Sequence, residues 1–401
     1  MDPFLGLRRP ADLQPLPVPG HHPVLAAKIA AEIDAGGPIT FARFMELALY
    51  DIEGGYYSAE EARPGRAGDF ITAPEAHPIF GWALARQVHE LWELLDRPNP
   101  FVIREHGAGT GALILGVLEG LSREVSPLLG ALRYQPVEVE PRRIDALAGR
   151  LRAAGHGTRL DLGSDAGGAA VTGLVLANEV LDALPVHRIR GLAGGAIEEL
   201  FVTHRGADFE EEAGPPSTQA LPDRLAAEGI ALRPGQEAEV CLAVDGWVRA
   251  AAAELRRGLL LLIDYGHPAA ELYDPIRRPR GTLLAYQHHR AVDNPFQSVG
   301  RQDLTAHVDM TAVEAAANRA GLPTVGITTQ SELLVSLGAG DLLAGLRDQP
   351  GATVEGYLAG RAALVRMLDP AAMGRFRVMA FGSGLPPGAR LRGLEFRLPP
   401  R

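Results

Sequence analysis

The run from Phe101 to Leu118 constrains the fold more than any other part of the chain. Phe101-Val-Ile103 is an apolar run typical of a buried strand, and Ala112-Leu-Ile-Leu-Gly-Val-Leu118 is typical of a helix. Between them lies the glycine turn Glu105-His-Gly-Ala-Gly-Thr-Gly111. A strand, a glycine turn and a helix form the unit that brings backbone amides close to a nucleotide in α/β proteins. The run therefore predicts a Rossmann-like sheet with a ligand at this turn.

The acidic residue before the turn narrows the choice of ligand. Dinucleotide sites use the spacing G-x-G-x-x-G and place a pyrophosphate at the helix N-terminus, whereas Glu105 gives this motif the spacing acid-x-G-x-G-x-G. A carboxylate at the strand end would repel a pyrophosphate, so a nicotinamide cofactor is disfavoured. The same carboxylate suits a ligand that carries an amine, a sulfonium and ribose hydroxyls, and S-adenosylmethionine carries all three. We therefore expect S-adenosylmethionine as cofactor, with Glu105 at its amino group and its contacts to the backbone made at Gly107, Gly109 and Gly111. The alternative is that the glycines serve only a turn or close packing.

Strand-like and helix-like segments alternate through the middle of the chain, which predicts a parallel sheet covered on both faces. The expected strands are Phe101–Glu105, Tyr134–Val139, Gly173–Ala177 and Gly258–Asp264. Ligands of such sheets bind beyond the carboxyl ends of the strands. We therefore expect the polar strand ends to gather there, namely Glu105, Glu138, Asn178 and Asp264.

The rest of the chain is expected to add to this core. Short antiparallel strands separated by glycine-rich turns are expected after residue 186, as an insertion with substrate contacts or a homodimer surface. The C-terminal part is expected to be helical, apart from a closing strand at Arg375–Phe381. The predicted organisation is a flexible N-terminal arm (1–23), an N-terminal helical region with a lid loop (24–96), the cofactor-binding core (97–185), the β-rich insertion (186–257), and the remaining core strands with helical additions (258–401).

Composition excludes several classes of protein. The formal net charge of −10 argues against nucleic acid as the main partner, because phosphate binding needs clustered Lys and Arg, and it suits a cationic protein or peptide. The single cysteine, Cys241, fits a reducing compartment. No apolar run approaches the roughly 20 residues of a membrane span, so a cytoplasmic protein is expected. Without a third ligand near the paired histidines, no metal site is expected.

Glu138 ends the strand that follows the glycine motif. A carboxylate at this position can accept hydrogen bonds from both ribose hydroxyls, as it does in Rossmann-like sites. The alternative is that Glu138, or the nearby Glu140, only caps a strand in solvent. We expect Glu138 to bind the cofactor.

Asn178-Glu-Val-Leu-Asp182 ends another expected strand, on the side where the transferable methyl group would lie. If the acceptor is an arginine, its guanidinium is protonated and lacks a free lone pair. Two carboxylates can grip it and hold its charge away from the reacting nitrogen. Glu179 and Asp182 are three residues apart, so on a helix they would share a face. We expect both to be catalytic, with Asn178 near the cofactor; helix capping is the alternative.

Two further segments supply candidates. Asp69 and Thr72 lie, with Glu75, in a loop long enough to be a lid, and we expect the first two to contact the cofactor. His307 and Asp309 alternate in sequence, so they share a face if extended. His307 has a side chain suited to accepting a proton from the substrate nitrogen. A structural histidine is an equally good interpretation.

These segments together resemble the MidA-like family, which contains a mitochondrial complex I assembly factor that is a protein arginine methyltransferase. The likeness extends from about Phe44 to Phe381. Its motifs are Phe44-Met-Glu-Leu-Ala-Leu-Tyr50, Gly55-Tyr-Tyr57, Gly68-Asp-Phe-Ile-Thr-Ala-Pro-Glu75, Phe80-Gly81, Glu105 through Gly111, Val137-Glu138, Asn178-Glu-Val-Leu-Asp-Ala-Leu-Pro-Val186, Asp264-Tyr-Gly266, Gly281-Thr282 and Asp303-Leu-Thr-Ala-His-Val-Asp309.

The resemblance implies a class I methyltransferase fold with helical additions, S-adenosylmethionine as methyl donor, and a protein substrate that presents an arginine. In the mitochondrial relative that substrate belongs to a core subunit of respiratory complex I. This chain departs from the family pattern at Ala108, where proline is usual, at Val139-Glu140-Pro141, where Ser-Pro is usual, and at Tyr50-Asp51-Ile52, where Tyr-His-Pro is usual. The departures keep the expected cofactor carboxylates but leave the protein target open.

Two other functions compete with protein arginine methylation. A small-molecule methyltransferase would favour a closed, aromatic-lined pocket, and aromatic residues make up only 6% of the chain. A cofactor-binding assembly chaperone would hold a partner without turnover; the presence of both Glu179 and Asp182 counts against it.

Overall fold

The computed structural model describes residues 20–58, 72–163, 169–287, 290–349 and 351–398. Its centre is a six-stranded sheet with the strand order β15-β16-β9-β4-β2-β3. The strands are β2 (Phe101–His106), β3 (Leu132–Val137), β4 (Val171–Asn178), β9 (Leu255–Asp264), β15 (Thr324–Thr329) and β16 (Arg377–Ser383). β3, β2, β4 and β9 are mutually parallel, and β16 runs antiparallel to both β9 and β15. The sheet is therefore mixed rather than parallel throughout.

Side chains alternate between two cores on the two faces of this sheet, as the period of a strand requires. Leu174 and Leu176 of β4 join one core, and Val175 and Ala177 join the other. The first core is covered by α4 (Ile79–Leu94), α5 (Ala112–Arg123), α12 (Gln330–Ser336) and α14 (Val354–Leu368). The second is covered by α9 (Ala243–Ala253) and α11 (Met310–Arg319).

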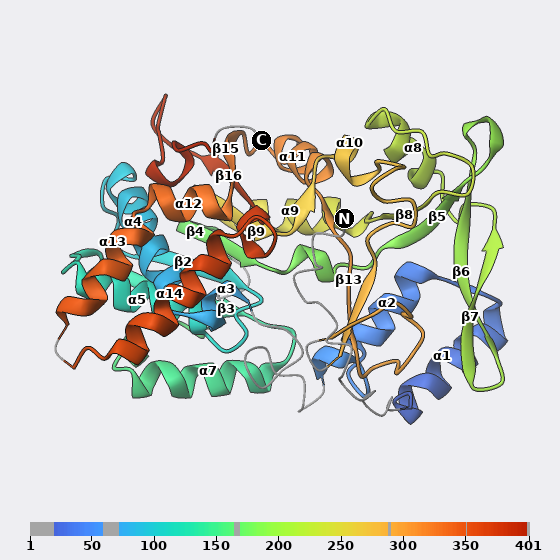
Figure 1. The fold of residues 1–401 in the computed structure, drawn as a ribbon, viewed down its shortest axis with the longest axis horizontal. Coiled ribbons are helices and arrows are strands. Elements are labelled where there is room, and N and C mark those ends of the chain that lie inside the picture. The colour runs from blue at the N-terminus through green and yellow to red at the C-terminus, as the bar shows by residue number, and fades with distance from the viewer. Residues whose placement is uncertain (1–19, 59–71, 164–168, 288–289, 350, 399–401) are drawn as a thin grey trace.

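A second, antiparallel sheet stands at one end of the molecule with α1 (Pro23–Gly36) and α2 (Phe41–Tyr50), as Figure 1 shows. Its strands are β1 (Ile39–Thr40), β5 (His187–Gly191), β6 (Ile197–Arg205), β7 (Asp208–Gly214) and β8 (Glu237–Val240). Phe41, Phe44, Val202 and Phe209 belong to one core, so the first two helices pack on the insertion, whereas α4 packs on the central sheet. The segment expected as one N-terminal helical region is thus divided between two cores.

The remaining helices and strands complete the described fold. They are α3 (Ala73–Ala76), α6 (Leu128–Ala131), α7 (Pro141–Ala153), α8 (Ala220–Ala227), α10 (Ala269–Leu272), α13 (Ala339–Ala344), β10 (Gly266–His267), β11 (Leu284–Gln287), β12 (Arg290–Val292), β13 (Asp303–Thr305) and β14 (Val308–Asp309). Across the described residues, every helix is too short or too polar to span a bilayer.

The expected core strands are all present, with ends that differ by at most three residues. The expectation of helix alone between Ala320 and Leu368 is wrong, because Thr324–Thr329 forms β15. The three threonines of this short segment favour a strand, and pairing with β16 supplies its backbone hydrogen bonds. The expected flexible arm lies almost wholly outside the described residues.

Candidate active site

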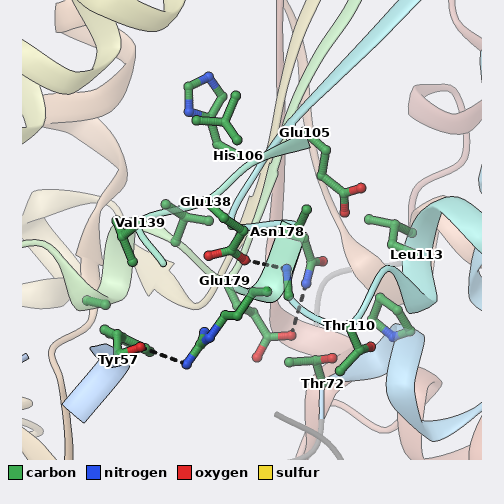
Figure 2. A pocket seen from close by; sticks show the side chains of 18 of the residues that line it. Tyr57, Thr72, Glu105, His106, Thr110, Leu113, Glu138, Val139, Asn178 and Glu179 are labelled. Atoms are coloured by element: carbon green, nitrogen blue, oxygen red, sulfur yellow. Dashed lines mark hydrogen bonds between the residues drawn. The ribbon is translucent and has the colours of Figure 1, made fainter. Parts of the chain in front are cut away.

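A cavity of about 330 Å³ lies at the carboxyl ends of β2, β3 and β4 (Figure 2). Three strand ends that the sequence placed there do line it, namely Glu105, Glu138 and Asn178. The fourth, Asp264, is not among the lining residues. The other lining residues are Tyr50, Tyr56, Tyr57, Thr72, Pro74, Glu75, His106, Gly107, Ala108, Gly109, Thr110, Ala112, Leu113, Val137, Val139, Arg143, Glu179, Val180, Ala183, Leu184 and Trp247.

The turn between β2 and α5 needs glycine for two separate reasons. Gly107 has φ +65°, and a Cβ there would lie 2.6 Å from the Cγ2 of Val180. Gly111 has φ +77°, and a Cβ there would lie 3.0 Å from Leu147 of α7. Such φ values disfavour any side chain. Gly107 and Gly109 line the cavity, whereas Gly111 lies behind it and holds the turn against α7.

Glu138 is tied to the glycine turn by its side chain. Gly109 donates its backbone N–H to Glu138 Oε1 over 2.5 Å (Figure 2). Among the described residues no other group donates a hydrogen bond to this carboxylate, which can accept several. The carboxylate is therefore fixed at the cavity wall and keeps acceptor capacity for a ligand.

Glu105 is buried at the end of β2. Tyr134 donates its hydroxyl to Glu105 Oε2 over 2.7 Å, from the neighbouring strand β3. Burial raises the pKa of Glu105 to about 8, and the tyrosine hydrogen bond opposes that rise. The group is thus mostly protonated at neutral pH and would ionise beside a cationic ligand.

Asn178 and Glu179 end β4 at the cavity. Asn178 Nδ2 donates to Glu179 Oε1 over 3.2 Å, and Figure 2 shows the two side chains pointing toward one another. Asn178 Oδ1 is buried with no hydrogen-bond partner among the described residues. Burial, and then the nearby charge of Asp182, raise the pKa of Glu179 to about 8. A buried acceptor without a donor and a carboxyl beside it favour a ligand that carries N–H groups and positive charge.

The expected helical turn from Glu179 to Asp182 is wrong. Glu179 is left-handed, with φ +53°, and only a short 3₁₀ turn follows, at Leu181–Ala183. The turn is held by Asp264, whose Oδ2 accepts the backbone N–H groups of Val180, Leu181 and Asp182 over 3.1, 2.8 and 3.3 Å. Since these bonds replace those of a longer helix, Glu179 faces the cavity while Asp182 does not line it.

Asp182 lies behind the cavity wall. It accepts a short hydrogen bond from the hydroxyl of Tyr265. Burial raises its pKa to about 6, and burial together with Asp182 and Glu179 raises the pKa of Asp264 well above its ordinary value. The half-buried Glu179 and the buried Asp182 and Asp264 form an acidic cluster at this edge of the sheet.

His307 lies outside the cavity, on the far side of Tyr265. The two rings meet edge to face with centroids 5.6 Å apart. Burial, His267 and Arg278 lower the pKa of His307 to about 3, so its imidazole is neutral at physiological pH. Asp309 caps α11 by accepting the N–H groups of Thr311 and Ala312. His307 therefore does not reach the cavity, which is where it would have to lie to accept a proton from the substrate.

The lid candidates fall in two groups. Asp69 lies outside the described residues. Thr72 lines the cavity at the start of α3, and Glu75 of the same short helix accepts a hydrogen bond from the Thr110 hydroxyl of the glycine turn.

Sequence reasoning missed the aromatic and cationic part of the wall. Tyr50 and Tyr57 stack with centroids 5.4 Å apart, and Arg143 of α7 donates to the Tyr57 carbonyl over 3.1 Å. Trp247 reaches the cavity from α9 and packs edge to face on His106. The Tyr50 and Tyr57 motifs were visible in the sequence, but only packing of the N-terminal segment onto the sheet edge shows that they line the site.

Comparison with known proteins assigns the family. Residues 83–328, more than half of the chain, match the profile of the family described as "Putative S-adenosyl-L-methionine-dependent methyltransferase". A Burkholderia thailandensis protein crystallised with S-adenosyl-homocysteine is 34% identical, with a TM-score of 0.83 over 94% of this chain and 97% of that one. The native structure of a protein from the same organism gives a TM-score of 0.82 at 34% identity, over 95% and 98%. The chain belongs to the MidA-like family of S-adenosylmethionine-dependent methyltransferases.

Curated relatives are more distant. The Drosophila melanogaster protein named protein arginine methyltransferase NDUFAF7 homolog, mitochondrial, is 28% identical over 75% of this chain and 71% of its own length. The human protein arginine methyltransferase NDUFAF7, mitochondrial, is 26% identical over 80% and 75%. Family membership confirms the predicted fold class and the predicted cofactor.

The buried acids predict a pH dependence of stability. Between its ordinary pKa of 4.5 and its folded value of about 8, Glu105 holds a proton in the folded chain that the unfolded chain has released. Stability therefore falls as pH rises from about 4.5 to about 8. Urea unfolding at pH 6 and pH 8.5 should show Glu105→Gln losing less stability across this range than the unmodified protein, by on the order of 2 kcal/mol.

Glu355→Gln, at an exposed position of α14, is the matched control and should keep the full loss. An identical loss in Glu105→Gln and in the unmodified protein would contradict a buried, protonated Glu105.

Proposed function

We propose that this methyltransferase acts on an arginine side chain of a protein, and that the protein is a subunit of a respiratory complex. The observation that carries the proposal is the acidic cluster of Glu179, Asp182 and Asp264. This cluster lies beside the cavity at the carboxyl ends of β2, β3 and β4. Like charges packed in a buried site are costly, and a cation offsets that cost. The names of the curated relatives support the arginine, and the respiratory complex rests on the resemblance to the MidA-like family.

The residues at the strand ends fit S-adenosylmethionine. Glu138 would accept the ribose hydroxyls, Glu105 would face the amino group, and the backbone at Gly107 and Gly109 would lie along the ligand. The buried Asn178 Oδ1 supplies an acceptor for a donor group. When bound, the cofactor supplies a methyl group made electrophilic by the positive sulfonium. Glu105 would then release its proton and form an ion pair with the amino group of the cofactor.

Glu179 would hold and orient the acceptor guanidinium. Its carboxylate can draw positive charge toward one end of the guanidinium, away from the nitrogen that gains the methyl group. That nitrogen must lose a proton, which the Glu179 carboxylate, once ionised beside the guanidinium, would accept. Asp264 positions Glu179 through the turn amides, and Asp182 adds negative charge from behind the wall.

A small-molecule acceptor is the second candidate. The aromatic residues Tyr50, Tyr56, Tyr57 and Trp247 line the cavity, and such walls suit flat apolar ligands. Glu179 lines the cavity next to Asp182 and Asp264, and this gathering of acidic groups favours a cationic acceptor such as arginine. The cytoplasmic location expected from the sequence also stays a prediction, since the curated relatives are named as mitochondrial.

Glu138 should be required for cofactor binding. Calorimetric titration with S-adenosylmethionine should show binding to the unmodified protein, and Glu138→Ala should weaken it by about tenfold or more, because one or two hydrogen bonds to a charged group are lost. Glu140→Ala is the matched control. Glu140 does not line the cavity and instead caps α7 by accepting the Arg142 N–H.

NADH in the same titration should not bind. Equal weakening by the two substitutions, or binding of NADH in place of S-adenosylmethionine, would contradict the assignment of Glu138.

Glu179 should be required for transfer rather than for cofactor binding. Glu179→Gln keeps the hydrogen bond from Asn178 and removes the charge, so methyl transfer should fall by about 100-fold or more while the affinity for S-adenosylmethionine changes little. Transfer is measured with methyl-labelled cofactor and protein extract from a strain lacking this enzyme, followed by hydrolysis and identification of the labelled amino acid.

Labelled methylarginine in the hydrolysed protein supports the proposal. Label in small molecules alone would favour the second candidate. Full activity of Glu179→Gln would contradict the role of Glu179.

A further inference from the structure

A second cleft, of about 1010 Å³, lies beside the first cavity. The wall between them is a row of contacting side chains. Asp182 accepts the Tyr265 hydroxyl, and the Tyr265 ring meets the ring of His307, which lines the second cleft. Val180 and Ala183 of the same turn line the first cavity. The two spaces are thus separated by the side chains of Asp182, Tyr265 and His307 in series.

Arginines dominate the charge of the second cleft. The loop after α10 contributes Arg277, Arg278 and Arg280, the 3₁₀ turn before β16 contributes Arg375, and the first residue of β16 is Arg377. Within the described part of the chain, the guanidinium groups of Arg277, Arg280, Arg375 and Arg377 donate no hydrogen bond and form no ion pair. Arg375 and Arg377 are two residues apart and both line the cleft.

Arg278 is half-buried and, unlike the other four arginines, its guanidinium has partners among the described residues. One of its nitrogens contacts His267 Nε2 at 2.6 Å, and the other donates to the backbone carbonyl of Glu271. The His267 ring stacks on His307 with centroids 5.3 Å apart. Since Arg278 can only donate, His267 must be neutral and accept at Nε2. Burial, and then the charge of Arg278, lower the pKa of His267 to about 4, while Glu271 opposes this shift.

Four acidic residues also line the cleft, namely Glu211, Glu237, Glu271 and Asp293, and in the described part of the chain none of them forms an ion pair with Arg277, Arg280, Arg375 or Arg377. Glu211 and Glu237 pair with Arg188 of β5, which also lines the cleft. Glu271 faces His267 at 3.4 Å. The arginines of the loop and those near the start of β16 therefore keep donors and charge for an external anion.

We propose that this cleft binds an acidic stretch of the acceptor polypeptide, with carboxylates on the arginines, while the methylated side chain enters the neighbouring cavity. The identity of that polypeptide as the acceptor rests on the proposed function. A protein acceptor cannot place its main chain inside the cofactor-type cavity, so it needs a surface next to the acidic cluster. The second cleft is about three times as large as the first. Asp182 and Tyr265 lie between the two spaces and are hydrogen-bonded to one another.

The test uses a fluorescein-labelled hexaglutamate peptide and fluorescence anisotropy with the full chain at low salt. The peptide should bind, and Arg375→Ala combined with Arg377→Ala should weaken binding by about tenfold, because two charge-assisted contacts are lost. The matched control combines Arg361→Ala and Arg366→Ala, at exposed positions of α14, and should bind as the unmodified protein does. Arg375→Lys combined with Arg377→Lys should recover part of the affinity because the positive charges are kept. Recovery would not be expected if the alanine variant had lost binding only by misfolding.

Absence of hexaglutamate binding, or equal loss in the control pair, would overturn the proposal. Displacement of the peptide by millimolar inorganic phosphate would assign the cleft to small anions, and displacement by a single-stranded RNA of 12 nucleotides would assign it to nucleic acid; either result overturns it. The readout does not require methyl transfer. If S-adenosylmethionine fails to bind while hexaglutamate still binds at Arg375 and Arg377, the proposed function fails and the peptide cleft stands.

Discussion

The hydrogen bonds that Asp264 accepts from the turn after β4 hold the acidic end of this site together. A single carboxylate oxygen accepts three backbone N–H groups, of Val180, Leu181 and Asp182. These bonds allow the chain to leave β4 through a left-handed Glu179 without a helix. Glu179 consequently faces the cavity, and Asp182 turns back toward Tyr265. The position of both acids, and the wall between the two clefts, depends on this one interaction.

The same burial that orders these acids sets their protonation. Glu105 and Glu179 both have a pKa near 8 in the folded chain, because burial disfavours the charged form. Each can therefore carry a proton until a cation arrives, and then release it. A sulfonium-bearing amino acid and a guanidinium are both cations. One edge of the sheet can therefore bind two positively charged groups. In their absence, it does not hold several ionised carboxylates close together.

Much of the fold was predictable because strand and helix periods are local. The apolar run Gly173–Ala177 predicted a strand, and Glu105 and Glu138 at expected strand ends predicted two acids at one edge of the sheet. The course of the chain after Asn178 was not predictable, since it depends on Asp264, which lies 82 residues beyond Asp182. His307 illustrates the same limit. Its spacing with Asp309 suggested a base, but tertiary packing places it behind Tyr265. Pairing with β16 likewise decided the state of Thr324–Thr329.

The measurement that tests this account most directly is proton release when S-adenosylmethionine binds. Calorimetric titration at pH 7, in two buffers of different ionisation enthalpy, counts the protons exchanged on binding. Because Glu105 has a pKa of about 8 in the free protein, the account predicts release of about one proton per ligand, and loss of that release in Glu105→Gln. Binding with the same apparent enthalpy in both buffers would contradict the claim that the buried acids are protonated until a cation arrives.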